Sequence, residues 1–255
     1  MNSPEMLNRY RSALLSHQRG RSLAPELLIE RAGDLEIYYA PFEHVNQSAR
    51  VVFVGITPGM QQAVNAIEQA ASELRKGSDD LSALSSAKEF ASFSGPMRTN
   101  LIACLDGIGL NQKLGVTSCA QAFSKGSTLA HFTSVLRYPT FLNGANFSGK
   151  PDIMRTPLLK SAVDKWFATE LDGLGGAVWI PLGPTPTAVL EHLAEQGKIS
   201  RGQIFAGLPH PSGANAERIS YFLGRKDKAA LSAKTDPAKL DKAKSKLLQQ
   251  VASMA

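Results

Sequence analysis

The stretch VVFVGITPG, residues 51–59, decides the fold of this chain. Its first four residues form an apolar run that is typical of a buried strand. Gly55 and the Pro58-Gly59 pair end that strand. Apolar residues then recur at helical spacing from Ala63 to Leu74, which predicts a helix directly after the turn. A buried strand that turns directly into an amphipathic helix is the beginning of a βα unit.

The same alternation of strands and helices continues on both sides of this stretch. We predict helical structure over 1–35, strands at 36–40, 131–136, 177–182 and 204–208, helices at 99–108, 158–171, 187–194 and 216–223, and a long loop at 140–157. The pattern predicts one α/β domain over residues 1–224, with a doubly wound, mostly parallel central sheet flanked by helices. Ligands of such sheets bind beyond the carboxyl ends of the strands.

Bulk composition favours a globular, soluble protein. The chain has 255 residues, of which 43% are hydrophobic and 20% are charged. It contains no apolar run near the roughly 20 residues that cross a bilayer, and its N-terminus does not resemble a signal peptide. Cys104 and Cys119 are too few for a disulfide scaffold or a thiolate metal cluster. We therefore expect a cytoplasmic monomer with no membrane contact and no metal.

The net charge of +6 is concentrated near the C-terminus. Residues 225–255 carry eight Lys or Arg residues against three Asp residues. This segment is predicted to form a basic, helical tail. Such a tail suits a polyanion such as DNA as its partner, and it is equally compatible with a helix that is simply solvated.

A second motif, His210-Pro211-Ser212-Gly213, follows the apolar run at 203–208. It places an imidazole and a hydroxyl at the carboxyl end of a predicted strand, just before a helix. A Pro-Ser-Gly turn is ordinary at a strand end when it occurs alone. Together with the turn at 55–59 and the segment 134–139, it predicts a single cleft built from three loops.

Several segments in this order resemble the uracil-DNA glycosylase superfamily, in a divergent branch without an iron–sulfur cluster. Each segment is common by itself, and the ordered set is more specific. The similarity covers most of residues 50–224. The segments are VVFVGITPG at 51–59, Phe93-Ser-Gly95 with the following 100–110, 133–139 (TSVLRYP), Gly183, and HPSG at 210–213.

The resemblance implies hydrolysis of an N-glycosidic bond in DNA after the nucleotide is flipped out of the stack. It implies that His210 donates a hydrogen bond to the departing base, that Thr57 stands at the water-positioning place, and that Phe93 stacks on the base. It requires neither a metal nor an organic cofactor. The remaining residues that it assigns to substrate binding are Gly55, Ile56, Pro58, Gly59, Ser134, Ser212, Gly213, Ala214 and Asn215.

Four positions depart from the better-known branches of that superfamily. Thr57 replaces an Asp, Asn or Glu, and a hydroxyl is a poor general base at neutral pH. Ser134 replaces a base-reading Asn, and Gly59 replaces the Tyr that excludes 5-substituted pyrimidines, which together predict a roomier pocket. Ala214 replaces a wedge such as Leu. Other candidates for positioning the water are Asn65, Glu68, Asn143, Asn146 and Asp152.

The resemblance, with these departures from it, therefore implies a monofunctional DNA glycosylase that excises a modified or bulky pyrimidine. Removal of hypermodified bases from phage DNA, as antiviral defence, is one role that fits. The alternatives are a uracil-excising repair enzyme, a catalytically inactive DNA-binding homologue, and, less favoured because of the basic tail, a glycosidase acting on free nucleosides or nucleotides.

Overall fold

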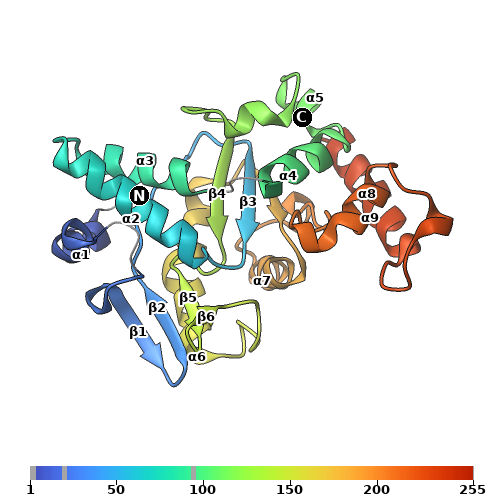
Figure 1. The fold of residues 1–255 in the computed structure, drawn as a ribbon. Helices are drawn as coiled ribbons and strands as arrows, with labels where there is room; N and C mark the ends of the chain where they lie inside the picture. The colour runs from blue at the N-terminus through green and yellow to red at the C-terminus, as the bar shows by residue number, and fades with distance from the viewer. Residues whose placement is uncertain (1–3, 19–21, 93–95, 255) are drawn as a thin grey trace. The chain divides into compact units, whose positions relative to one another are not determined.

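The computed structural model describes residues 4–18, 22–92 and 96–254 (Figure 1). It confirms the α/β class, since helices alternate with strands along the chain. These residues form two compact units. The first unit lies within Met1–Gln47, Gly55–Ser92 and Phe132–Gly175, and the second within Ser48–Val54, Phe93–His131 and Gly176–Ala255.

The first unit contains an antiparallel sheet with the strand order β1-β2-β5-β6. Asn143 and Gly144, with φ angles of 51° and 73°, form the two-residue turn between β5 and β6, as expected for an Asn-Gly hairpin. The strands are β1 (Leu28–Ala32), β2 (Leu35–Tyr38), β5 (Thr140–Leu142) and β6 (Ala145–Asn146).

Two predictions for this unit were wrong. Residues 28–32 form strand β1 rather than a continuation of the N-terminal helix, and the predicted loop 140–157 contains β5 and β6. β1 is a partly exposed edge strand that pairs with β2. Its Glu30 and Arg31 hide the alternating apolar pattern of a strand, so pairing with β2 outweighed the local sequence preference.

Helices of the first unit are α1 (Glu5–Ser16), α2 (Met60–Arg75), α3 (Asp80–Ala91) and α6 (Pro157–Ala162). The helix predicted after the turn at 55–59 is confirmed as α2. α2 lies beside α3 (Figure 1), and alanines dominate the buried faces of both helices. The break predicted near residues 77–80 is also present, because the Asp79 carboxylate accepts the Ser82 N–H at 3.0 Å and begins α3.

The second unit contains a parallel sheet with the strand order β4-β3-β7. The last residues of β3 and β4 belong to the first unit. The strands of this sheet are β3 (Val51–Gly55), β4 (Ala130–Ser134) and β7 (Val178–Pro181). β3 pairs with β7 from Val51 opposite Val178 to Val54 opposite Pro181. The helices are α4 (Pro96–Asp106), α5 (Leu110–Leu114), α7 (Pro184–Glu195), α8 (Ala216–Phe222) and α9 (Pro237–Ala252).

The strand predicted at 204–208 is reduced to one bridge between Trp179 and Ile204. Gly207 has a φ of 124°, which lies outside strand geometry and favours glycine. A β-carbon at Gly207 would stand 2.9 Å from Cβ of Ala243 on α9. The close approach of α9 therefore replaces further strand pairing along this segment.

The C-terminal helix α9 packs into the second unit. Its Leu247 and Val251 are 0% and 3% exposed. On its other turns, Tyr221 of α8 donates a hydrogen bond to the Asp241 carboxylate at 3.0 Å, and the Lys244 ammonium donates one to the Phe222 carbonyl at 2.7 Å. Among the described residues, no helix combines the length and the apolar character that crossing a membrane requires.

Replacing Leu247 with Ala should lower the free energy of unfolding by about 2–5 kcal/mol, because it removes a fully buried side chain. Chemical denaturation provides the measurement. The matched control is Leu248→Ala, one residue further along, whose side chain is 43% exposed. Equal destabilisation in the two variants would contradict the packing of α9 through Leu247.

Candidate functional site

His210 in the second unit is held as a neutral imidazole with a defined proton position. Its Nδ1 accepts the N–H of Ser212 at 3.3 Å. A ring nitrogen that accepts a hydrogen bond carries no proton, so the proton of the neutral ring sits on Nε2. Burial lowers the pKa of His210 below its usual 6.5. At neutral pH, His210 is therefore a hydrogen-bond donor through Nε2.

The turn that carries His210 is supported on several sides within the second unit. Asn100 of α4 donates a hydrogen bond to the Pro211 carbonyl at 2.9 Å, and Asn215 donates one to the Ser212 hydroxyl at 3.1 Å. A β-carbon at Gly183 would stand 3.7 Å from Cδ2 of His210, so Gly183 lies against the imidazole. Gly213 and Ala214 are exposed at the tip of the turn.

A cavity of about 810 Å³ adjoins His210 within this unit. Its lining includes Gly183 and the start of α7, Asn215, and residues of the C-terminal segment. The side chains that bring charge to the lining are Glu191, Arg218, Lys234, Asp236 and Lys239. Composition alone indicates the basic segment, but it does not show which lysines line a cavity.

In the first unit, the turn after β3 is joined to the segment after β4. The Gly55 carbonyl accepts the Val135 N–H at 3.0 Å, and the Ile56 carbonyl accepts the Leu136 N–H at 2.9 Å. These bonds bring the predicted residues Gly55, Ile56 and Ser134 together. Pro58 is buried directly beyond them.

Thr57 links this turn to β5 and to the segment that precedes it. Its hydroxyl accepts the Thr140 N–H at 3.0 Å and donates to the Tyr138 carbonyl at 3.1 Å. A hydroxyl has one proton, and this bond uses it. Thr57 can therefore only accept a hydrogen bond from a further molecule such as water.

Asn146 occupies the space beside Gly59 that was predicted from the sequence to be open. A β-carbon at Gly59 would stand 3.3 Å from Nδ2 of Asn146. The Asn146 side-chain oxygen accepts the Met60 N–H at 2.9 Å at the start of α2. Gly59 thus makes room for the side chain of Asn146, which reaches the turn from β6.

Asn146 is also the water-positioning candidate that the structure places at this turn. The Asn65 oxygen accepts a hydrogen bond from Gln61 along α2, and Asp152 accepts the Arg155 N–H in its own loop. Asn143 lies in the hairpin turn, and Glu68 lies on α2. The five candidates thus lie on α2, in the hairpin of β5 and β6, and in the loop after β6.

Buried charges hold the segment after β4. Nε of Arg137 contacts the Glu170 carboxylate at 2.5 Å, and this carboxylate is fully buried. Burial raises the pKa of Glu43 to about 7 and lowers that of Lys88 to about 8. The Lys88 ammonium donates hydrogen bonds to the carbonyls of Phe42 and His44 at 3.0 and 2.6 Å. No sequence pattern indicated this cluster, because its charged residues come from distant segments.

One relative places the chain in a family. YoxB of Bacillus subtilis (strain 168), described as an uncharacterized protein, is 39% identical over 202 residues, which cover 78% of this chain and 79% of YoxB. The chain belongs to the YoxB family. No family model matches the chain, and no solved structure matches it.

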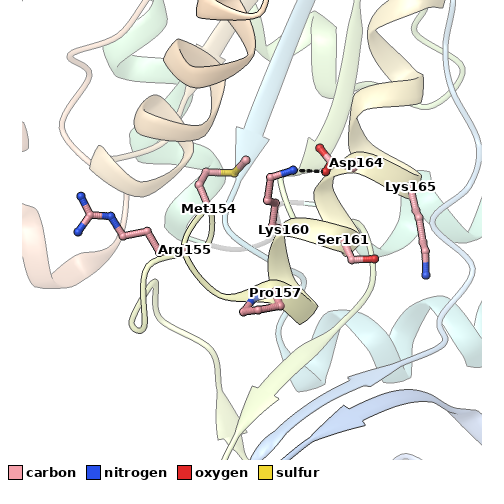
Figure 2. Close-up of a pocket in the computed structure, with 7 residues that line it drawn as sticks. All are labelled: Met154, Arg155, Pro157, Lys160, Ser161, Asp164 and Lys165. Atoms are coloured by element: carbon pink, nitrogen blue, oxygen red, sulfur yellow. Dashed lines mark hydrogen bonds and ion pairs between the residues drawn. The ribbon is translucent and has the colours of Figure 1, made fainter.

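Figure 2 shows a second cavity of this YoxB-family chain, of about 540 Å³, in the first unit. Lys160 and Asp164, which form an ion pair at 2.5 Å, line it, and none of the predicted site residues does. Phe93, the predicted stacking residue, lies outside the described residues. Among the described residues, no three His, Cys, Asp or Glu side chains are grouped as metal ligands.

Thr57→Val should lower the free energy of unfolding of this YoxB-family protein by roughly 1–3 kcal/mol, because the fully buried Thr140 loses the acceptor for its N–H. Thr57→Ser keeps the hydroxyl and should stay closer to the parent. Denaturant titrations measure both variants. A Thr57→Val protein as stable as the parent would show that the two hydrogen bonds do not hold this turn.

The unfolding free energy of the Glu43→Gln variant, relative to that of the parent, should rise as the pH rises. The buried carboxyl has a pKa of about 7 in the folded chain and about 4.5 in the unfolded one. The folded state therefore holds the proton more tightly, and the parent loses stability as the pH rises from 4.5 to 7. Unfolding free energies at pH 4.5 and pH 8 measure this, with Glu36→Gln, near the surface, as the control. If parent and variant differ in unfolding free energy by the same amount at both pH values, the raised pKa of Glu43 would be contradicted.

Proposed function

We propose that this protein is a monofunctional DNA glycosylase that hydrolyses the N-glycosidic bond of a flipped-out pyrimidine. The observation that carries the proposal is His210, a neutral imidazole whose Nδ1 is occupied by the Ser212 N–H and whose Nε2 carries the proton. The sequence resemblance assigns the same residue to the leaving base. DNA as the substrate is supported further by the cationic side chains that line the cavity beside it.

The geometry suits stabilisation of a departing anion. When the bond between the sugar carbon and the base nitrogen breaks, its electron pair leaves with the base and charge develops on a base carbonyl oxygen. A donor fixed before the reaction stabilises that charge without reorganisation, an effect of about 3–4 kcal/mol in other enzymes. Water adds to the sugar carbon and releases a proton, so the products are the free base and an abasic site.

The proposed fold follows from the same comparison of motifs. The β4-β3-β7 sheet is proposed to be the core of a doubly wound, uracil-DNA glycosylase-like fold, with the HPSG turn beyond it. Its parallel strands, and the turns that follow β3 and β7 and lead into helices, support this assignment.

The proposed substrate is a modified or bulky pyrimidine, with uracil as the alternative. The small Ser134 side chain supports the first, because it offers fewer fixed hydrogen bonds to a uracil edge than an asparagine does. Gly59 supports it only if Asn146 moves, since Asn146 fills the adjacent space. In either case, Thr57 is assigned to holding the turn and accepting a hydrogen bond from water, and not to removing a proton.

A DNA-binding protein without turnover is the second candidate. The Thr57 hydroxyl favours it, because its proton is committed to the Tyr138 carbonyl and no carboxylate stands at that position. Such a protein would bind DNA and release no base.

His210→Ala should lower the rate of base release by roughly 10²–10³-fold, the usual effect of removing one donor to a developing anion. Mass spectrometry of the released base provides the measurement. The substrates are uracil-containing DNA and DNA with hydroxymethylated or glucosylated cytosine, in single- and double-stranded form. His192→Ala is the matched control, since the His192 ring contacts Gln196 one helical turn away.

The pH profile provides a further check. Release should be constant at and above pH 7 and fall in acid, because a protonated Nδ1 can no longer accept the Ser212 N–H. Release that is unaffected by His210→Ala would contradict the assigned role. Binding of DNA without release of any base would favour the second candidate.

A further inference from the structure

The C-terminal segment is fixed in place by the helix that follows the HPSG turn. The Glu217 carboxylate of α8 accepts hydrogen bonds from Lys226, from the N–H and hydroxyl of Ser232, and from the Thr235 hydroxyl, at 2.5–3.1 Å. These hydrogen bonds order the connection between α8 and α9. Lys234 lies between Ser232 and Thr235, so its backbone belongs to a connection that is held on both sides.

Arg218 links this connection to the HPSG turn. Its guanidinium donates hydrogen bonds to the Asn215 side-chain oxygen at 2.7 Å and to the Lys234 carbonyl at 3.0 Å. Asn215 in turn donates to the Ser212 hydroxyl. A guanidinium has five N–H groups, so Arg218 keeps donors beyond these two hydrogen bonds. The series of hydrogen bonds joins the turn of His210 to the backbone of Lys234.

Three cationic side chains line the cavity that adjoins His210. Arg218, Lys234 and Lys239 line it together with two carboxylates, Glu191 and Asp236. Asp236 accepts the Lys239 N–H at 3.1 Å as the cap of α9, so part of its charge is already compensated by the helix N-terminus. Lys234 and Lys239 are exposed on this wall. The cavity is therefore open to an anion from solvent.

We propose that this cavity binds the phosphodiester backbone of the nucleic-acid strand, through Lys234, Lys239 and Arg218. The inference rests on the proposed function for the identity of the anion. It makes the C-terminal segment part of the substrate-binding surface, and it makes the substrate a polynucleotide and not a free nucleoside. A volume of about 810 Å³ accommodates a nucleotide segment, since pockets for small ligands range over roughly 300–1,000 Å³.

The test is the salt dependence of DNA binding, measured by fluorescence anisotropy with a labelled single-stranded oligonucleotide. Lys234→Ala/Lys239→Ala should weaken binding and reduce the slope of log K against log salt by about 0.7 for each phosphate that the variant no longer neutralises. The control is Lys242→Ala/Lys246→Ala, which removes the same charge from exposed positions of α9 outside the cavity. The control pair should change the slope less.

A second variant tests the sign of the effect. Glu191→Gln removes a carboxylate from the cavity wall and should strengthen binding, while Glu195→Gln, one turn further along α7 and paired with Arg201, should not. Equal changes in the two lysine pairs would overturn the proposal in favour of bulk charge. No change in either pair would also overturn it.

Base release is measured separately in the same variants, so the two proposals can fail independently. Normal base release with an unchanged salt slope in Lys234→Ala/Lys239→Ala would remove the phosphate site and leave the glycosylase. If the variant shows a reduced salt slope while the parent protein releases no base, the phosphate site stands and the glycosylase proposal fails.

Discussion

Parallel pairing of β3 with β7 is the constraint on which the second unit depends. It joins Val51–Val54 to Val178–Pro181, two segments that are far apart in the sequence. Parallel strands cannot be joined by a tight turn, so the intervening chain must leave the sheet and return. Trp179 of β7 forms the bridge to Ile204. Gly183, which follows β7 and precedes α7, lies against the His210 ring. The pairing of β7 thus fixes the strand that leads to Gly183, which lies against the imidazole.

A backbone hydrogen bond decides which ring nitrogen of His210 can donate. The Ser212 N–H occupies Nδ1, and burial disfavours the charged ring. A neutral donor is suited to a developing anion, whereas an imidazolium would be costly to desolvate. The supporting asparagines, Asn100 and Asn215, bind the backbone and the hydroxyl of the turn rather than the ring. The turn is therefore held in place by contacts that do not involve Nε2.

In the first unit, the turn at 55–59 is shaped by contacts with residues that are distant in the sequence. Thr57 is committed to Thr140 and Tyr138, and Gly59 provides room for Asn146. Both sets of contacts come from the hairpin of β5 and β6 or from the segment between β4 and β5. The hairpin therefore shapes this turn, and the buried ion pair of Arg137 with Glu170 anchors the segment that precedes it.

The sequence by itself determined the α/β class and helix α2 after the Gly-Pro turn, because these depend on local periodicity and on residue type. It also predicted His210 as a catalytic residue, and that role stays a prediction. Only the tertiary structure decided that β1 is a strand, that Asn146 fills the space beside Gly59, and that Lys234 and Lys239 line the cavity of His210. Edge pairing, side-chain reach and the packing of α9 through Leu247 join residues that are distant along the chain. No local pattern encodes such contacts, since their free energy is gained only when the remote partner is present.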